Sequence, residues 1–553
     1  MRIPRFPVTL PWHGLALISL CALYLLAGLT GHDPWKNDDA IHFGIVHGLL
    51  NGHNWLIPQL SGAPLETPPL YYWIAAVCGK ILGELMPLHD AVRLASGLFG
   101  ALFLAFLAYA GRTLFVRENS RQQPRSTDAQ RNAGDAAPLI AIGCLGLLVP
   151  IHDTQPMVAL LAASAAFYAG CAMLPRRPVA GGMTAGASLG FGFLAGGLTA
   201  PITLLPVLLL LPINSHWRTR TSFGGLAIAL ISGAILCAIW PLLLVWQEPD
   251  ALQSWWSYAT AAMQLHNKWL QILSDFAELL GWFSWPALPL ALWSVWLNRR
   301  RLEQPDIALP LIGTLTVLPI LLLFYDPRPL QALPLLVPLI LLAANSAAHL
   351  RRGAANAFDW FSMMTFTILA GLIWLGGIAM NSGVPAQIAH NFAKLEPGFV
   401  ASFSPLAYVV ASLLSLAWFW IIFASPRSHW RGVTHWAVGI TLMWTLLMAL
   451  WLPWIDYGKT YRGVAGSLKQ ALPKNAGCIA GRNLGDVQRI SFEYFSGIVT
   501  LRAGTQAAST CSLLLEQSSK RKETVPSGWH KLWEGHRASD RSERIRLYQR
   551  GPQ

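Results

Sequence analysis

The segment LALISLCALYLLAGLTG at residues 15–31 carries no charge, and WKNDDAIHFG at residues 35–44 follows it closely. An apolar helical run of this kind can cross roughly 30 Å of hydrocarbon. No small-residue cleavage site follows it, so we interpret it as a retained first membrane span near 12–31 rather than a signal peptide. The second segment sets two adjacent aspartates, Asp38 and Asp39, where the chain leaves the membrane.

The composition agrees with a membrane protein. Of the 553 residues, 54% are hydrophobic and only 12% are charged, and the mean hydropathy is +0.43. These values exclude a water-soluble globule. The net charge of +13 is spread in short clusters between apolar runs, so the sequence favours a lipid bilayer as partner over nucleic acid.

The basic clusters define a topology, because cytoplasmic loops carry the excess of Lys and Arg. The clusters taken as cytoplasmic are Arg2/Arg5, Arg112 to Arg131, Arg176/Arg177, Arg218/Arg220, Arg299 to Arg301, Arg351/Arg352 and Arg427/Arg431. About thirteen spans fit this map, near 12–31, 91–111, 138–151, 157–174, 183–198, 201–213, 222–246, 276–297, 306–324, 330–348, 358–378, 403–424 and 433–453. An odd number puts the N-terminus in the cytoplasm and the C-terminus outside.

Two segments depart from simple spans. A full crossing at residues 70–86 would place the cluster around Arg112 outside, so we predict an interfacial or re-entrant helix there. Residues 183–213 are too long for one span and are broken near Gly196, Gly197 and Pro201, which predicts two short helices. The loop from Arg112 to Arg131 is expected to be a disordered connection.

The composition becomes that of a soluble protein from about residue 454. An amphipathic helix pattern, a turn at residues 473–477 and a short strand at CIAG predict a small α/β domain over residues 454–553. The topology places this domain outside the membrane, where a Cys478–Cys511 disulfide is chemically possible. Two unpaired thiols are the alternative. Residues 1–453 form the predicted membrane domain, and 31–90 its first outer loop.

Asp38 and Asp39 open a segment in which Ile41, Ile45 and Leu49 repeat at helical spacing, which predicts a helix along the membrane interface. The simplest role for the acidic pair is to cap this helix and complement its dipole. Composition alone favours that role over a functional one.

The rest of the loop favours a functional role for the acidic pair. NGHNWLIPQLSGAPLETPPLYYW at residues 51–73 follows the acidic pair with Asn-Trp-Leu-Ile-Pro, then Gly62, then Glu66-Thr67-Pro68-Pro69-Leu70-Tyr71-Tyr72-Trp73. In order and spacing this loop resembles the first external loop of the ArnT and protein-O-mannosyltransferase group, membrane glycosyltransferases of the GT-C fold. HDTQPMVALLAASAAFYA at residues 152–169 resembles their second external acidic turn, and weaker landmarks follow at 241–256 and 327–343.

The sequence also departs from the pattern of this group. The acidic segment has Asp39 where the relatives have Glu, and Ile41 and His42 where they have Arg and Tyr. Thr67 and Ala200 occupy the positions of two lysines that would meet phosphate.

The resemblance implies a GT-C-like fold and transfer of a sugar from a polyprenyl-phosphate donor to an envelope lipid, glycan or protein acceptor. The reaction would take place at the periplasmic face of a bacterial inner membrane. The implied catalytic set is Asp38, Asp39 and Asp153. Asp38 would be the general base for a hydroxyl acceptor, or would orient an acceptor that is already anionic. Asp153 would orient donor or acceptor, or would simply cap a helix.

The implied substrate-binding residues lie in three outer segments: Glu66, Thr67, Tyr72, His266, Lys268 and Arg328. Arg328 is the preferred cation for the leaving phosphate, with Lys268 second; an ordinary interfacial anchor is the alternative for Arg328. The resemblance implies no particular cofactor, and a divalent metal at Glu66 is the less favoured alternative to a solvated or capping role.

A non-catalytic binder or carrier of polyprenyl-linked sugars is the rival function, because loss of two phosphate-facing lysines would fit it. Retention of Asp38, Glu66 and the Pro-Pro turn favours the enzyme. An ion-coupled transporter would need ionisable residues within its spans, and the predicted spans have almost none.

Overall fold

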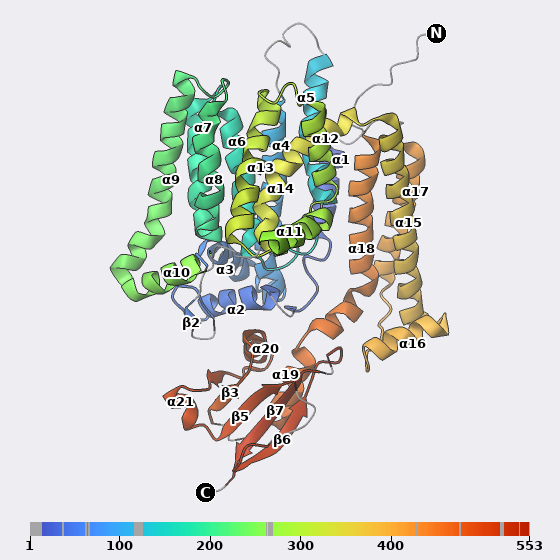
Figure 1. Ribbon diagram of the computed structural model, residues 1–553. Coiled ribbons are helices and arrows are strands. Elements are labelled where there is room, and N and C mark those ends of the chain that lie inside the picture. Colours follow the sequence, from blue (N-terminus) through green and yellow to red (C-terminus); the bar gives the residue numbers. More distant parts are fainter. Residues whose placement is uncertain are drawn as a thin grey trace.

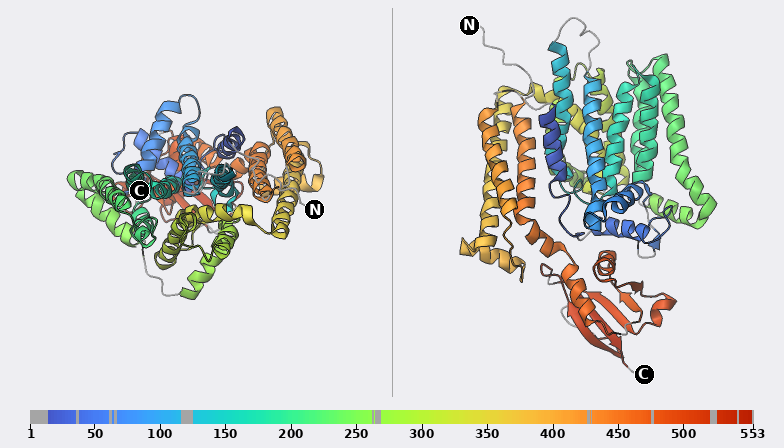
Figure 2. Two further views of the ribbon diagram at one scale, coloured as in Figure 1. Left: turned by 90° about the horizontal axis from the view of Figure 1, so that it is seen from above. Right: turned by 180° about the vertical axis from the view of Figure 1, so that it is seen from behind.

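A computed structural model describes residues 14–35, 38–60, 63–64, 67–115, 125–261, 263, 269–425, 428, 430–474, 477–519, 525–540 and 542–551. Within these residues a bundle of long helices forms one part of the molecule, and a small sheet with its own helices lies beyond one end of the bundle (Figure 1). The two parts are joined by the last helix of the bundle (Figure 2).

Nine of the described helices are long and apolar enough to span a membrane. They are α4 (Leu88–Leu114), α6 (Pro156–Met173), α7 (Pro178–Gly196), α9 (Arg220–Gln247), α13 (Pro305–Phe324), α14 (Pro329–Ser346), α15 (Arg352–Ser382), α17 (Pro405–Ala424) and α18 (Arg431–Lys459). Three of the other four predicted spans overlap shorter helices, α1 (Leu15–Leu26), α8 (Thr199–Leu210) and α12 (Ala287–Leu297), and the fourth overlaps α5 (Arg125–Gly143), whose apolar part is the short stretch Gly134–Gly143. The polytopic helical class is therefore confirmed, and the exact number of crossings stays a prediction.

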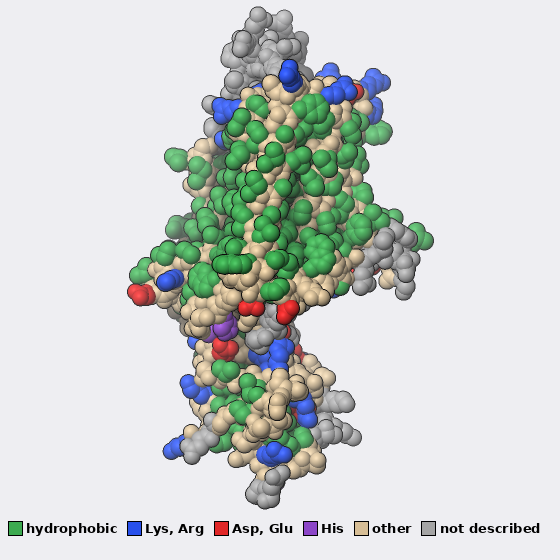
Figure 3. Space-filling model, turned by 90° about the vertical axis from the view of Figure 1, so that its left-hand side faces the viewer, with side chains coloured by type: hydrophobic (Ala, Val, Ile, Leu, Met, Phe, Trp, Pro, Cys, Tyr) green, Lys and Arg blue, Asp and Glu red, His purple; other side chains and the backbone are tan. Residues whose placement is uncertain are grey.

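The bundle is apolar outside as well as inside. Side chains such as Ile231, Leu242 and Phe423 are exposed, and Figure 3 shows hydrophobic side chains covering the flank. Glycines allow close packing within the bundle: a Cβ on Gly170 would lie 2.6 Å from the backbone nitrogen of Ala185. Such small-residue contacts are how helices associate in a solvent that is itself apolar.

Two predicted boundaries were wrong. The single span at 276–297 is two helices, α11 (Trp269–Phe283) and α12, with a break at residues 284–286. Pro286 lies in the break, and its ring and missing N–H disfavour a continuous helix. The predicted span 138–151 instead ends at Gly143, and a 3₁₀ turn at Leu145–Leu147 follows it. Helix α5 starts at Arg125, so the second part of the predicted disordered loop is helical.

Short elements cover the end of the bundle that faces the sheet. They are α2 (Asp38–Leu50), α3 (Leu70–Leu82), α10 (Pro249–Ala261), α16 (Ala386–Leu395) and the paired strands β1 (Gln59–Leu60) and β2 (Ala63–Pro64). Helix α3 lies beside α2 at this end (Figures 1 and 2), where the sequence predicts an interfacial or re-entrant helix.

The C-terminal part is a five-stranded sheet in the order β4-β3-β5-β7-β6. Its elements are α19 (Arg462–Ala471), β3 (Ile479–Arg482), α20 (Asp486–Ser496), β4 (Thr500–Arg502), α21 (Gln506–Ser509), β5 (Leu513–Ser518), β6 (Trp529–Gly535) and β7 (Arg544–Arg550). Strand β3 runs parallel to β4 and β5, whereas β7 runs antiparallel to β5 and β6. Leu468, Phe492 and Leu515 lie in the core between helices and sheet. This is the small α/β unit predicted from residue 454 onward, although α18 continues to Lys459 before it begins.

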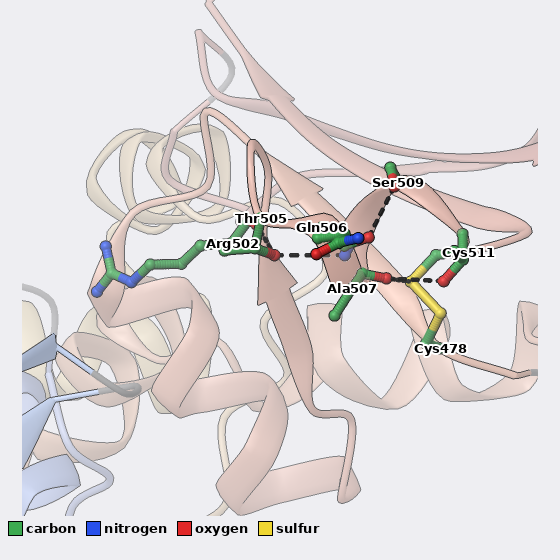
Figure 4. Close-up of a disulfide and its surroundings, with 9 residues drawn as sticks. Cys478, Arg502, Thr505, Gln506, Ala507, Ser509 and Cys511 are labelled. Carbon is green, nitrogen blue, oxygen red and sulfur yellow. Dashed lines mark hydrogen bonds between the residues drawn. A yellow bond between two sulfur atoms is a disulfide. The ribbon is translucent and has the colours of Figure 1, made fainter.

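Cys478 and Cys511 are joined by a disulfide, with their Cα atoms 5.1 Å apart. The bond links the chain just before β3 to the turn that follows α21 (Figure 4).

The C-terminal unit rests on the first outer loop through α20. Ile490 packs against Gly44 of α2, where an added Cβ would clash with the Ile490 side chain. Tyr494 is hydrogen-bonded to His89 at the start of α4 (2.9 Å). The unit therefore contacts the segment that carries the acidic pair.

Candidate active site

The acidic pair begins helix α2, and its two members have different surroundings. Asp38 is exposed, whereas only 2% of Asp39 is exposed. Consecutive residues of a helix point about 100° apart, so one carboxylate can turn into the protein while its neighbour stays at the surface. The backbone N–H of Ala40 donates to the carbonyl of Trp35 (3.1 Å) and closes the turn that precedes the helix.

Asp39 is held by Arg93, a fully buried residue of α4. Arg93 Nη2 donates to Asp39 Oδ2 at 3.0 Å, and Arg93 Nη1 donates to Asp90 Oδ1 at 3.0 Å. The same guanidinium reaches the carbonyl oxygens of Leu29, His32 and Asp33. Burial acts to raise the pKa of Asp39, but the charge of Arg93 outweighs it and holds the pKa below its usual range. Asp39 is thus a permanent anion that orders the loop around it.

Asp153 lies beside this pair, in the turn before α6. The backbone N–H of Thr154 donates to Asp39 Oδ1 at 2.8 Å, and Ser96 Oγ donates to the carbonyl oxygen of Asp153 at 2.6 Å. Burial and the negative charge of Asp39 together raise the pKa of Asp153 to about 7. This carboxyl group can therefore gain or lose a proton near neutral pH.

Asp38 faces outward near Arg328. Partial burial raises the pKa of Asp38, and the positive charge of Arg328 opposes that rise. Arg328 stands just before α14, is largely exposed, and forms an ion pair with Asp326 (3.1 Å). The negative charge of Asp38 also acts on Asp153, so the three aspartates form one cluster at the end of the bundle.

The positions of the two missing lysines lie in different settings. Thr67 Oγ1 is hydrogen-bonded to Tyr72 Oη (2.9 Å), which is also hydrogen-bonded to His42 Nδ1 (2.8 Å). Ala200 is fully buried in an apolar cluster with Leu160. Neither position supplies a positive charge.

The junction between α18 and α19 contacts the loop before the acidic pair. Asp456 Oδ1 accepts from the indole N–H of Trp35 (2.8 Å) and from the backbone N–H of Asp33 (2.9 Å). Arg462 Nε donates to Asp33 Oδ2 at 2.8 Å, and Lys459 Nζ lies 4.2 Å from the centroid of the Trp35 ring. The junction thus lies against the residues that precede the acidic pair, although it is distant from them in sequence.

The structure brings together Asp38, Asp39, Asp153 and Arg328 from the predicted set, and it links Thr67 to Tyr72. Glu66, His266 and Lys268 lie outside the described residues. In the part of the chain that is described, no three His, Cys, Asp or Glu side chains are grouped to hold a metal ion.

Sequence reasoning missed Arg93 and Lys459. Arg93 falls inside the predicted span 91–111, and an ionisable residue at that depth is itself a functional signal. Lys459 comes shortly after the last predicted span, where basic residues are ordinary, so no local signal marked it.

Comparisons with known proteins agree with this architecture. No protein-family model matches the chain. It is 24% identical over 458 residues to an undecaprenyl phosphate-alpha-4-amino-4-deoxy-L-arabinose arabinosyl transferase of Pseudomonas savastanoi pv. phaseolicola, which covers 79% of this chain and 77% of the relative. It is 28% identical over 449 residues to the transferase of the same description from Pseudomonas aeruginosa PAO1, covering 78% of this chain and 74% of the relative.

The fold is similar to crystal structures of ArnT from Cupriavidus metallidurans. The TM-score is 0.66 for the apo state and 0.67 for the state bound to undecaprenyl phosphate, each at 14% identity over 97% of this chain and 98% of that chain. The helical bundle and the C-terminal unit of this chain thus share the fold of these two structures. The chain is similar in sequence and in fold to the ArnT-like group of GT-C membrane glycosyltransferases.

Proposed function

We propose that this protein transfers a sugar from a polyprenyl-phosphate donor to an envelope lipid, glycan or protein acceptor at the periplasmic face of the inner membrane. The observation that carries the proposal is the cluster of Asp38, Asp39 and Asp153 at the end of the bundle. It occurs in a chain that is similar along most of its length to arabinosyl transferases. We extend to this chain the lipid-phosphate donor of those relatives and not their particular sugar.

Asp38 is the reactive carboxylate in this proposal. In the transfer, the bond between the anomeric carbon and the donor phosphate oxygen breaks, and its electron pair stays on the phosphate. A bond from the acceptor oxygen to the anomeric carbon forms. If the acceptor is a hydroxyl, its proton passes to Asp38, which is exposed enough to reach it. If the acceptor is already an anion, Asp38 orients the substrates instead.

The other two carboxylates have supporting roles. Asp39 is neutralised by Arg93 and anchors the start of α2 and the turn at Thr154. Asp153 orients donor or acceptor beside Asp38, and its proton affinity near neutral pH suits a group that hydrogen-bonds to sugar hydroxyls in either state. Arg328 contributes positive charge on the side of Asp38.

We infer that residues 1–453 form the membrane domain with its N-terminus in the cytoplasm, and that residues 454–553 lie in the periplasm. Lys and Arg side chains gather at the end of the bundle opposite the C-terminal unit (Figure 3), in support of a cytoplasmic location for that end. The disulfide supports an oxidising compartment for the other end. Alkylation of intact cells with a membrane-impermeant maleimide tests this inference: Cys478 should react only after addition of a reductant. Reaction of both thiols without reductant would reject it.

Turnover by the full-length protein in lipid tests the proposed function. Wild type and Asp38→Asn are supplied with mixed polyprenyl-phosphate sugars and an envelope lipid and glycan extract, and the released polyprenyl phosphate is measured. We expect Asp38→Asn to lower turnover by a factor of about 10²–10⁴. Asp250→Asn is the matched control, because Asp250 is also an exposed aspartate in the first turn of a helix.

Tight binding of the lipid donor with no release by wild type would contradict the proposal and favour the carrier. Equal release by wild type and Asp38→Asn would leave a transferase but remove Asp38 from its chemistry.

A further inference from the structure

The α18–α19 junction presents a cation that the proposed mechanism has not used. Lys459 ends α18, and its side chain is exposed. Its neighbour Arg462 is paired with Asp33. Among the described residues, by contrast, no carboxylate forms an ion pair with Lys459, whose ammonium group lies over the Trp35 ring. A cation that is held in place without being neutralised is suited to receive an anionic ligand.

Trp35 links this cation to the carboxylate cluster. Its backbone N–H donates to Asp39 Oδ2 at 3.0 Å, its indole N–H donates to Asp456, and its ring face carries Lys459. The first contact holds the backbone at Trp35 and the other two involve the indole itself, so Lys459 has a defined platform. The charge of Lys459 also acts on Asp153, so the ammonium group lies within electrostatic range of the cluster.

The reaction needs such a charge. The donor phosphate is a diester with one negative charge, and the phosphate that leaves is a monoester that gains further negative charge as the sugar departs. A cation fixed beside the phosphate oxygen that leaves the sugar therefore interacts more strongly with the transition state than with the bound donor. Thr67 and Ala200 cannot supply it, and Arg328 is already paired with Asp326 at 3.1 Å.

We propose that Lys459 binds the phosphate of the polyprenyl donor and of the departing polyprenyl phosphate, in place of the cations absent at positions 67 and 200. This inference rests on the proposed function and names the residue that completes its phosphate site. The same chemistry could serve a phosphate on a lipid acceptor, so the test compares the two kinds of lipid.

Binding to the purified full-length protein in nanodiscs tests the inference. The probes are undecaprenyl phosphate, uncharged undecaprenol, and phosphatidic acid as a phosphate on a different lipid. Lys459→Met should weaken binding of undecaprenyl phosphate about tenfold or more, because hydrogen bonds between charged groups are stronger than those between neutral groups. Undecaprenol should bind equally well, and Lys459→Arg should retain most of the affinity. Lys394→Met, at the exposed end of α16, is the control cation and should change nothing.

The possible failures are distinct. If wild type binds undecaprenyl phosphate and Lys459→Met binds it equally well, this inference is overturned and the proposed function stands. If undecaprenol binding falls as well, Lys459 has only a structural role and the inference is again overturned. If Lys459→Met weakens only the binding of phosphatidic acid, Lys459 binds the phosphate of the acceptor and the inference is overturned. Failure of wild type to bind undecaprenyl phosphate would reject the proposed function together with the inference.

Discussion

The loop that carries the acidic pair and the α18–α19 junction contact each other beside the carboxylate cluster, and they differ in how they can be recognised. The loop carries a contiguous motif with Asp38 and Asp39. Within this loop Thr67 occupies a position where the related group has a lysine. The junction has no motif, yet it places Asp456, Lys459 and Arg462 against the loop.

This difference shows that the acidic and basic halves of the site come from different parts of the chain. The carboxylates follow the family-like pattern, whereas the described cations near them come from α4, from the start of α14 and from the end of α18. A lysine lost from a motif can therefore be replaced by a cation from another element, because only position in space matters to a phosphate.

The largest effect on stability is expected where the loop depends on a buried charge. Arg93→Met leaves Asp39 and Asp90 unpaired, and breaking a buried pair from one side costs about 3–5 kcal/mol. Thermal unfolding in detergent measures this loss of stability. Arg328→Met is the control for stability, because both members of the Arg328–Asp326 pair are exposed and the pair should contribute below about 1 kcal/mol. Equal stability of both variants would contradict the anchoring role of Arg93.

The disulfide tests how far the junction depends on the fold of the C-terminal unit. Cys478→Ser opens a link between residues 33 positions apart, and the chain-entropy model gives a loss of about 3–4 kcal/mol for a loop of that size. Limited proteolysis of the C-terminal unit should become faster. Cys78→Ser, which removes a free thiol, is the comparison and should leave proteolysis unchanged.

A smaller effect is expected at the contact between loop and junction. Arg462 is the more exposed partner of its pair with Asp33, so Arg462→Gln should cost about 1 kcal/mol. A double-mutant cycle with Asp33→Asn isolates the coupling between the two side chains. Burial acts to raise the pKa of Asp33, but Arg462 and Thr460 lower it overall. The contribution of Asp33 is therefore present above its ordinary pKa and fades as pH falls through the lowered one. A coupling energy of zero at neutral pH would mean that the Arg462–Asp33 pair does not stabilise the contact between the loop and the junction.

The smallest effect near neutral pH is the change in stability per pH unit that comes from Asp153. Its folded-state pKa is raised to about 7, so its contribution favours the folded state most below the ordinary carboxyl pKa and is lost as pH rises through about 7. Near that pH the slope should be about 0.7 kcal/mol per pH unit, half of the full 1.4 for one proton. Asp153→Asn should flatten the curve of stability against pH between about 4 and 7. An unchanged slope would show that Asp153 does not titrate in this range.

The sequence by itself determined the membrane class, the approximate positions of the long apolar helices and the acidic loop before α3. These features depend on neighbouring residues: a span is a contiguous apolar run, and the resemblance is carried mainly by residues 38–73. The break at Pro286 was missed because apolar residues continue across it, so hydropathy alone gives no boundary there.

Only the tertiary structure decided which charges meet. Arg93 contacts Asp39 across 54 positions, and Asp456 contacts Asp33 across 423. Nothing in the local pattern around Lys459 indicates that its helix ends beside Trp35. It is helix packing that brings these side chains within a few ångströms, and their charge interactions depend on that distance and on the loss of water around them.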